Sequence, residues 1–228
     1  MDPIRESHRG ITTLEADSIL LEYQHRKVLQ NIYIRIEKGK ITGLLGRNGC
    51  GKSSLIEIIY GIRQAQYSSV RLDGRFVRNV YKQKDVAAYL PQHPFVPGHM
   101  KVGEALLQYE SALPEALDYF PELEKLLPNR FNSLSGGEQR LVETVMVISG
   151  PASFVILDEP FSNVMPLHVE TLKYWLSVIK SRKGILITDH YYQDVLAVSD
   201  QVYLLTTEGR TVALEQPVQQ LKDLGYIN

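Results

Sequence analysis

The most constraining feature of this 228-residue sequence is a glycine-rich turn between an apolar segment and a helical pattern. Residues 46–53 read Gly-Arg-Asn-Gly-Cys-Gly-Lys-Ser, which matches the phosphate-loop pattern G-x-x-x-x-G-K-[ST]. Residues 41–45 form a short apolar run, and residues 53–60 place apolar side chains at helical spacing before Gly61, a stop signal. A strand, a glycine turn and a helix in this order predict an α/β domain.

This turn has the composition that phosphate binding requires. Glycines allow consecutive backbone N–H groups to surround a phosphate, and the following helix N-terminus adds partial positive charge. We expect Lys52 to bridge the β- and γ-phosphates of ATP and the Ser53 hydroxyl to coordinate Mg²⁺. The predicted nucleotide-binding residues of this segment are Gly46, Arg47, Asn48, Gly49, Cys50, Gly51, Lys52, Ser53 and Ser54.

Cys50 is the only cysteine of the chain, so no internal disulfide forms and a reducing compartment is expected. A thiol beside a helix N-terminus can have a lowered pKa, so one hypothesis is a redox switch; the favoured alternative is a small filler residue. Residues 1–10 are polar and mixed in charge, and no apolar run approaches the roughly 18 residues of a membrane span. We predict a cytoplasmic location, with any membrane role supplied by a partner chain.

Short apolar segments alternate with helical patterns along the remaining chain, which predicts a mostly parallel sheet. Residues 101–127 are helical in composition and are interrupted by prolines, which predicts a small helical insert. We expect one domain over 1–228, with a helical subdomain at about 93–150. The predicted strands are 32–36, 41–45, 86–90, 153–157, 184–188 and 201–206; the helices are 53–60, 135–149 and 169–179; and a hairpin at 70–77 turns at Asp73-Gly74.

An apolar strand at 154–157 is followed by two acids, Asp158 and Glu159. Because a buried parallel strand needs no charge, carboxylates at its C-terminal end lie where α/β sheets place their ligands. We predict that Asp158 binds Mg²⁺ and that Glu159 polarises the attacking water. Acidic residues often end strands, so this pattern alone is only moderately specific. Its occurrence together with the phosphate loop favours the functional interpretation.

Residues 134–140 read Leu-Ser-Gly-Gly-Glu-Gln-Arg. Ser135 and Glu138 form a Ser-x-x-Glu capping box, which by itself predicts only a well-capped helix. The two glycines after the cap leave backbone N–H groups uncovered at the helix N-terminus. The segment therefore predicts an anion site that faces outward, toward another molecule.

These motifs resemble, in type and order, those of ATP-binding cassette (ABC) ATPases, with residues 134–140 as the signature sequence. The resemblance covers nearly the whole chain. It implies a P-loop NTPase fold of ABC type, with a mostly parallel sheet core, an antiparallel β subdomain and a short helical subdomain. It also implies that two subunits hold two ATP molecules between them head to tail. The residues that would contact the partner's nucleotide are Ser135, Gly136, Gly137 and Glu138.

Three further residues acquire roles from the same resemblance. Gln92 resembles the Q-loop glutamine, which senses Mg²⁺ and the attacking water and faces the membrane partner. His190 resembles the switch histidine that contacts the γ-phosphate, and Tyr23 resembles the adenine-stacking aromatic. The alternatives are a solvated loop glutamine, a structural histidine and a core or surface tyrosine.

One position departs from the family pattern. Residues 162–165 read Ser-Asn-Val-Met, where the family usually ends in aspartate, so Met165 lacks the carboxylate of a loop that couples two ATP sites. We expect hydrolysis that persists through Glu159 and His190 but is slow or dependent on a partner.

The resemblance implies the ATP-binding and hydrolysing subunit of an ABC transporter, peripheral on the cytoplasmic face of the membrane through integral permease subunits and paired with a second ABC subunit. Two alternatives stay open: a soluble ABC switch acting on protein or nucleic acid, and a binding-only protein, which Met165 suggests. The formal net charge of -1, without long blocks of one sign, argues against a nucleic-acid partner.

Overall fold

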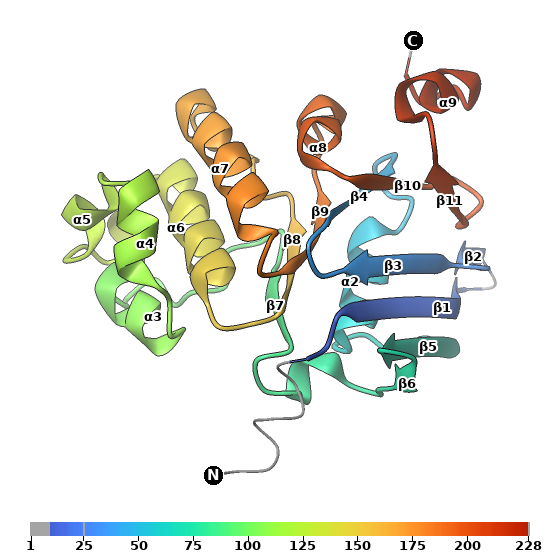
Figure 1. Cartoon of the computed structure of the whole chain (residues 1–228), viewed down its shortest axis with the longest axis horizontal. Coiled ribbons are helices and arrows are strands. Elements are labelled where there is room, and N and C mark those ends of the chain that lie inside the picture. The colour runs from blue at the N-terminus through green and yellow to red at the C-terminus, as the bar shows by residue number, and fades with distance from the viewer. Residues whose placement is uncertain (1–9, 25, 228) are drawn as a thin grey trace.

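The computed structural model describes residues 10–24 and 26–227, which form two sheets and a set of helices (Figure 1). The six-stranded sheet has the order β11-β10-β4-β9-β8-β7. Its strands from β10 to β7 run parallel, and β11 pairs antiparallel with β10, so the predicted mostly parallel sheet is confirmed. The strands are β4 (Ile41–Gly46), β7 (Ala87–Leu90), β8 (Phe154–Asp158), β9 (Gly184–Thr188), β10 (Gln201–Leu205) and β11 (Thr211–Leu214).

The central strands are apolar on both faces because each face is covered. Leu44 and Ile156 point into a core shared with helix α2 (Lys52–Tyr60) and the second sheet, whereas Leu45 and Leu157 point into a core on the other face. The second core is covered by α6 (Gly136–Ser149), α7 (Pro166–Ile179) and α8 (Tyr192–Val198) (Figure 1). Burial on two sides explains why these strands are continuous apolar runs.

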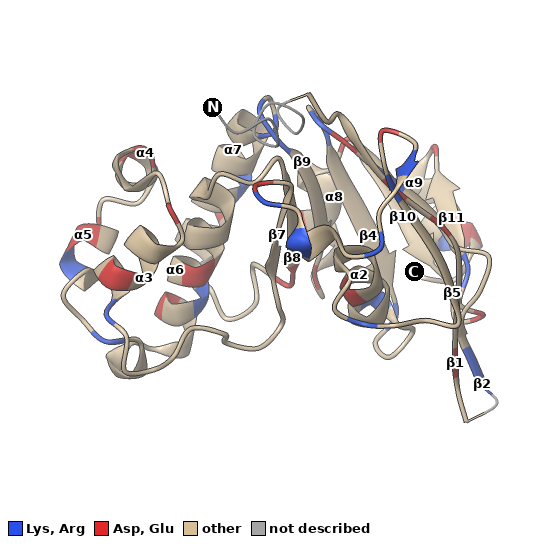
Figure 2. Cartoon of the chain, turned by 90° about the horizontal axis from the view of Figure 1, so that it is seen from below, with Lys and Arg blue, Asp and Glu red and all other residues tan. Residues whose placement is uncertain are grey.

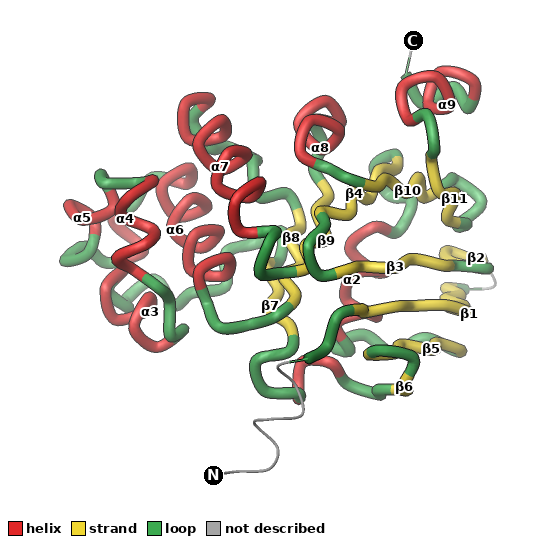
Figure 3. The backbone as a smooth tube through the Cα atoms, viewed as in Figure 1, coloured by secondary structure: helices red, strands yellow, loops and turns green. Residues whose placement is uncertain are grey.

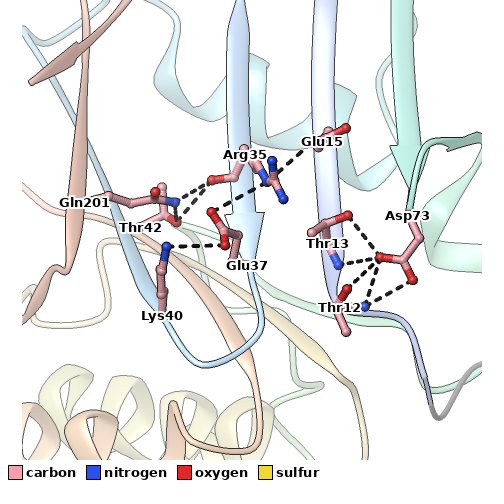
Figure 4. Close-up of polar contacts among 9 residues, drawn as sticks. All are labelled: Thr12, Thr13, Glu15, Arg35, Glu37, Lys40, Thr42, Asp73 and Gln201. Carbon is pink, nitrogen blue, oxygen red and sulfur yellow. Dashed lines mark hydrogen bonds and ion pairs between the residues drawn. The ribbon is translucent and has the colours of Figure 1, made fainter.

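The second sheet is antiparallel, with the path β2-β1-β5-β6 and with β3 paired to β1. Its hairpin turns at Asp73 and Gly74, both in the left-handed region with φ 47° and 76°, as predicted. The Asp73 carboxylate accepts a hydrogen bond of 2.9 Å from the Thr13 N–H (Figure 4). The strands are β1 (Thr13–Tyr23), β2 (Arg26–Leu29), β3 (Tyr33–Glu37), β5 (Tyr67–Leu72) and β6 (Arg75–Phe76).

Polar contacts join the two sheets where β3, β4 and β10 meet (Figure 4). The Gln201 side-chain amide donates to the Arg35 carbonyl and to the Thr42 hydroxyl, both at 2.7 Å. Lys40 forms an ion pair of 3.3 Å with Glu37 across the turn between β3 and β4. Because β4 leads into the glycine-rich turn, these contacts fix the strand that positions it.

A group of helices lies to one side of the sheets, so that a helix-rich part and a strand-rich part are separate in Figure 3. Pro114 lies in the first turn of its helix and Pro121 and Pro128 lie between or after helices, so the prolines delimit the short pieces. No helix among the described residues is long and apolar enough to cross a membrane. The remaining helices are α3 (Val102–Gln108), α4 (Leu113–Tyr119), α5 (Leu123–Leu126) and α9 (Pro217–Asp223), with single turns η1 (Val80–Lys82) and η2 (Phe131–Ser133).

The sequence analysis did not predict β1, β2 or α8. In β1 the alternation of buried residues changes phase at Ser18, whose φ is 52°, because Leu14 and Ala16 are followed by Ile19 and Leu21. The register with β5 shifts at the same place. This irregularity breaks the period-two signal that identifies a strand.

Candidate active site

The phosphate-loop segment connects β4 to α2, and its glycines are required by close packing as well as by conformation. A Cβ on Gly46 would lie 2.6 Å from the Cys50 sulfur and 2.8 Å from the Leu205 carbonyl oxygen. Gly49 and Gly51 have φ of 76° and 106°, which a side chain disfavours. The backbone therefore has a path that other residues would not adopt easily.

Lys52 directs its charge back into this loop. Its side chain is buried, and Nζ donates to the Gly46 carbonyl at 2.8 Å and to the Arg47 carbonyl at 3.5 Å. Arg47 in turn donates to the Gly225 carbonyl at 2.6 Å, which anchors the loop to the C-terminal segment. The ammonium group is thus held within reach of the loop amides, the position in which a phosphate would meet it.

Cys50 packs inside the loop. Burial raises the pKa of its thiol, and the nearby Lys52 charge only partly opposes that rise. The redox hypothesis requires a lowered pKa, so the raised pKa argues against it. The Cys50 sulfur occupies the space into which a side chain on Gly46 would extend, which favours the small-filler interpretation.

Asp158 ends β8 with its carboxylate buried beside the loop, only 1% exposed. The hydroxyls of Ser53 and Tyr89 lie close to this carboxylate, and neither of its oxygens makes a hydrogen bond of full geometry with the described residues. Burial raises the pKa of Asp158, and the proximity of the Ser53 hydroxyl and the Lys52 charge acts in the opposite direction. A buried carboxylate beside the Ser53 hydroxyl is an oxygen donor set that fits Mg²⁺.

Glu159 follows in the left-handed region, with φ 60°. Its N–H donates to the Thr188 carbonyl at 2.7 Å, and its carbonyl accepts from Arg140 at 3.1 Å. Its carboxylate lies 2.9 Å from Nε2 of His190 and accepts a 3.4 Å bond from the Ser162 hydroxyl. The structure therefore brings Glu159 and His190 together, a contact that the sequence analysis did not predict.

Gln92 and Tyr23 lie on the periphery of this group. Gln92 is exposed in the loop after β7, whose neighbour in the sheet is β8. Tyr23 is 62% exposed at the end of β1, in a hairpin with β2. Val28 of β2 would lie 3.1 Å from a Cβ on Gly51, so this hairpin contacts the phosphate loop. The roles of Gln92 and Tyr23 stay predictions.

The capping box at the start of α6 is formed as predicted. The Ser135 hydroxyl accepts from the Glu138 N–H at 3.3 Å. The Ser135 hydroxyl and N–H donate to the Glu138 carboxylate at 2.7 and 2.8 Å, and these two hydrogen bonds lower the pKa of Glu138. Ser135 and Gly136 are exposed. The space around Gly136 is open, whereas a Cβ on Gly137 would lie 2.4 Å from the Asn163 carbonyl oxygen. The helix tip thus faces outward, with its second glycine packed on the loop that leads to Met165.

Met165 lies at the N-cap of α7, is 62% exposed and makes no side-chain capping hydrogen bond. Its thioether therefore supplies neither the charge nor the acceptor of an aspartate. The slow turnover expected from this substitution stays a prediction.

Three buried charged residues around the site were missed by the sequence analysis. Arg140 and Glu143 lie on α6, and Asp189 accepts from the Phe161 N–H at 3.0 Å next to Glu159. The signal that could have found Arg140 and Glu143 is their position one turn apart beside the apolar residues Leu141, Val142 and Val145 of the predicted helix, because buried charges need partners.

Comparison with known proteins shows which sequences and structures this chain is similar to. A family model described as ABC transporter matches residues 29–162. The lipopolysaccharide export system ATP-binding protein LptB of Escherichia coli (strain K12) is 29% identical over 229 residues, covering 93% of this chain and 94% of that protein. A probable ABC transporter ATP-binding protein of Azorhizobium caulinodans is 30% identical over 217 residues, covering 89% of this chain and 76% of that protein.

Solved structures share the fold. The ATP-binding subunit of an ABC transporter superposes with a TM-score of 0.80 at 24% identity, covering 93% of this chain and 94% of that one. A nucleotide-free ATP-binding cassette has a TM-score of 0.78 at 23% identity, covering 96% and 100% of the two chains. These likenesses confirm the predicted fold, in which a parallel core carries an antiparallel sheet and a helical part.

Proposed function

Because this chain belongs to the ABC transporter family and is an ATP-binding and ATP-hydrolysing subunit, we propose that two such subunits close head to tail around two ATP molecules to drive a membrane transporter. The observation that carries this proposal is the exposed tip of α6, where Ser135 caps the helix and Gly136 leaves backbone amides open. A helix N-terminus of this kind attracts a phosphate, and it is directed away from its own subunit.

In this proposal the phosphate loop holds the triphosphate through its amides and Lys52. Ser53 and Asp158 would hold Mg²⁺, with Gln92 sensing the ion, and the bound ion would supply positive charge beside the phosphate oxygens. Glu159 orients and deprotonates the attacking water, and His190, in contact with Glu159, lies ready to meet the γ-phosphate. Tyr23 stacks on the adenine.

The partners in this proposal are integral membrane subunits and a second ABC subunit. The helical part at 93–150 is the surface that would grip the membrane subunits, on the cytoplasmic face. Lys and Arg are interspersed with Asp and Glu along the helices and strands (Figure 2), and the formal net charge is -1, which argues against a nucleic-acid partner. This charge distribution favours transport over a switch acting on nucleic acid.

Affinity capture tests the transporter assignment. Tagged Glu159→Gln, loaded with ATP and exposed to detergent-solubilised membranes of its own cell, is expected to retain integral membrane proteins, because blocked hydrolysis holds the closed dimer on its partners. Mass spectrometry of the retained fraction identifies them. The same bait with Lys52→Ala added, which weakens nucleotide binding, is the control; recovery of no integral protein by the first bait would favour a soluble role.

Gly136→Ala tests the two-subunit site. A methyl group there meets open space within the subunit, and Ala is the better helix former by about 1 kcal/mol, so folding and ATP binding by the monomer are expected to be unchanged. In the Glu159→Gln background, ATP-driven dimerisation is expected to weaken, because the added methyl covers amides that would face the partner's phosphate. Mass measured by light scattering with and without ATP follows this.

The matched control is Gly10→Ala, another glycine with no atom within 4 Å of an added Cβ, which is expected to dimerise like its parent. An ATP-driven dimer of full strength in the Gly136→Ala protein would contradict the sandwich arrangement.

A further inference from the structure

The guanidinium group of Arg140 connects α6 with the loop that carries Gln92 and with the end of β8. Arg140, on α6, is buried, and its Nη1 donates to the Pro91 carbonyl at 2.7 Å. Its Nε donates to the Glu159 carbonyl at 3.1 Å, and its Nη2 donates to the Asp158 carbonyl. Pro91 immediately precedes Gln92, so the planar fork of Arg140 joins the Gln92 loop to the end of β8.

Glu143 extends this connection one turn further along α6. Its carboxylate is fully buried and accepts from the N–H groups of Phe95 at 3.0 Å and Val96 at 3.3 Å. Its second oxygen lies 3.9 Å from Nη1 of Arg140. Two neighbouring side chains of α6 thus hold residues 91 and 95–96, the two ends of the segment that carries Gln92.

The charge on Arg140 is preserved despite its burial. Desolvation lowers the pKa of Arg140, but the four surrounding carboxylates of Glu143, Asp158, Asp189 and Glu159 favour the charged form. A guanidinium group stays protonated in such surroundings because its ordinary pKa is far above neutral pH. The three carbonyl contacts are therefore charge-assisted hydrogen bonds, which are about twice as strong as neutral ones.

These contacts determine the backbone of the residue proposed to activate water. Glu159 has φ 60°, in the left-handed region, which is unfavourable for a residue with a side chain. Its N–H is fixed by Thr188 of β9 and its carbonyl by Arg140 of α6. Loss of the Arg140 contact would release one of the two restraints that hold this conformation.

We propose that Arg140 is a positioning residue for ATP hydrolysis, which fixes the Glu159 backbone and the Gln92 loop to the helix whose tip carries Ser135. The proposal rests on the function proposed above. At a rise of about 1.5 Å per residue, Ser135 and Arg140 lie less than two turns apart on one rigid helix. Contact of the tip with a partner's nucleotide is thereby coupled mechanically to the geometry of both Glu159 and the Gln92 loop.

Lys183 provides a matched comparison for a purely structural buried cation. It is also buried, and its Nζ donates to the carbonyls of Gly150 and Ala152, both at 2.6 Å. These acceptors follow the opposite end of α6. Lys183→Met removes a buried cation with two backbone acceptors and leaves the contacts to residues 91–96 and 158–159 intact.

The test compares Arg140→Met, Arg140→Lys and Lys183→Met by steady-state ATP hydrolysis and by thermal unfolding. Arg140→Met is expected to lower kcat by about 10- to 100-fold, the scale measured for residues that orient catalytic groups, with the KM for ATP changed less than about twofold. Arg140→Lys keeps the charge but not the planar fork of donors, so its kcat is expected to lie between those of the wild type and Arg140→Met. Lys183→Met is expected to lower Tm and leave kcat within about twofold.

A double substitution separates positioning from a general structural effect. In the Glu159→Gln background, Arg140→Met is expected to cost at least about threefold less in kcat than in the wild-type background, because the Glu159 carboxylate that Arg140 helps to position is already removed. A full additional loss would overturn the proposal, as would a wild-type kcat in Arg140→Met alone or a kcat loss in Lys183→Met as large as that in Arg140→Met.

A second measurement does not depend on hydrolysis. Hydrogen exchange of the nucleotide-free protein is expected to be faster at the amides of 95–96 and 159 in Arg140→Met, with exchange in 46–53 unchanged. Unchanged exchange at 95–96 and 159 would overturn the positioning role. Absence of hydrolysis by the wild-type protein and its partners would instead count against the proposed function.

Discussion

Replacing Glu159 with Gln is expected to lower kcat for ATP hydrolysis by about 100-fold or more while ATP binding persists. Gln is isosteric but cannot take a proton from the attacking water, and the carboxylate that lies 2.9 Å from His190 would be lost. The ATP-loaded protein is also expected to accumulate as a dimer. Phosphate release measures the rate, fluorescence titration measures binding, and light scattering measures the mass.

Glu170→Gln is the control for this experiment. Glu170 lies on α7 with its side chain 71% exposed, and its surface ion pair with Lys173 is expected to contribute little. Its hydrolysis rate is expected to equal that of the wild type. Turnover near the wild-type rate in Glu159→Gln would reject Glu159 as the base, and an unchanged monomer mass with ATP would count against the two-subunit site.

Lys52→Ala is expected to weaken ATP binding by about 10- to 100-fold, the range that follows from losing charge-assisted hydrogen bonds of about 1.5–3 kcal/mol, and to remove measurable hydrolysis. Lys52 is the buried cation directed into the loop, where its Nζ donates to the Gly46 carbonyl at 2.8 Å. Isothermal titration with ATP measures the affinity.

Lys84→Ala removes an exposed lysine elsewhere and serves as the matched control, with an affinity expected to equal that of the wild type. Circular dichroism checks that both variants fold. An ATP affinity within about twofold of the wild type in Lys52→Ala would show that the loop does not hold a phosphate in the proposed way.

The parallel core was predictable because each strand carries its own signal. Residues 184–188 and 41–45 are mostly apolar, since both faces of these strands are buried, and Gly61 ends α2 in the left-handed conformation that its position required. The strand β1 was not predictable, because Ser18 interrupts its alternation. Helix α8 has only seven residues, which is too short for a clear helical period.

The candidate site was predictable in its parts and not in its contacts. Ser135 and Glu138 are three residues apart, so their capping box is a local property of the sequence. The pair of Glu159 and His190 depends on β8 and β9 being neighbours, which the sequence does not state. Arg140 reaches Pro91 across 49 positions of the chain, so its role emerges only from the folded arrangement.

The close approach of Gly137 to the Asn163 carbonyl packs the start of α6 directly against the segment that precedes α7. A Cβ at position 137 would lie only 2.4 Å from that oxygen. At such close packing, we expect the start of α6 and the segment leading into α7 to move together. Any larger side chain at 137 would push the 163–165 segment outward. The residue at position 165 can therefore vary in charge, but the path of the backbone at 163–165 is restricted. That backbone packs against the α-hydrogen of Gly137, where a side chain would not fit.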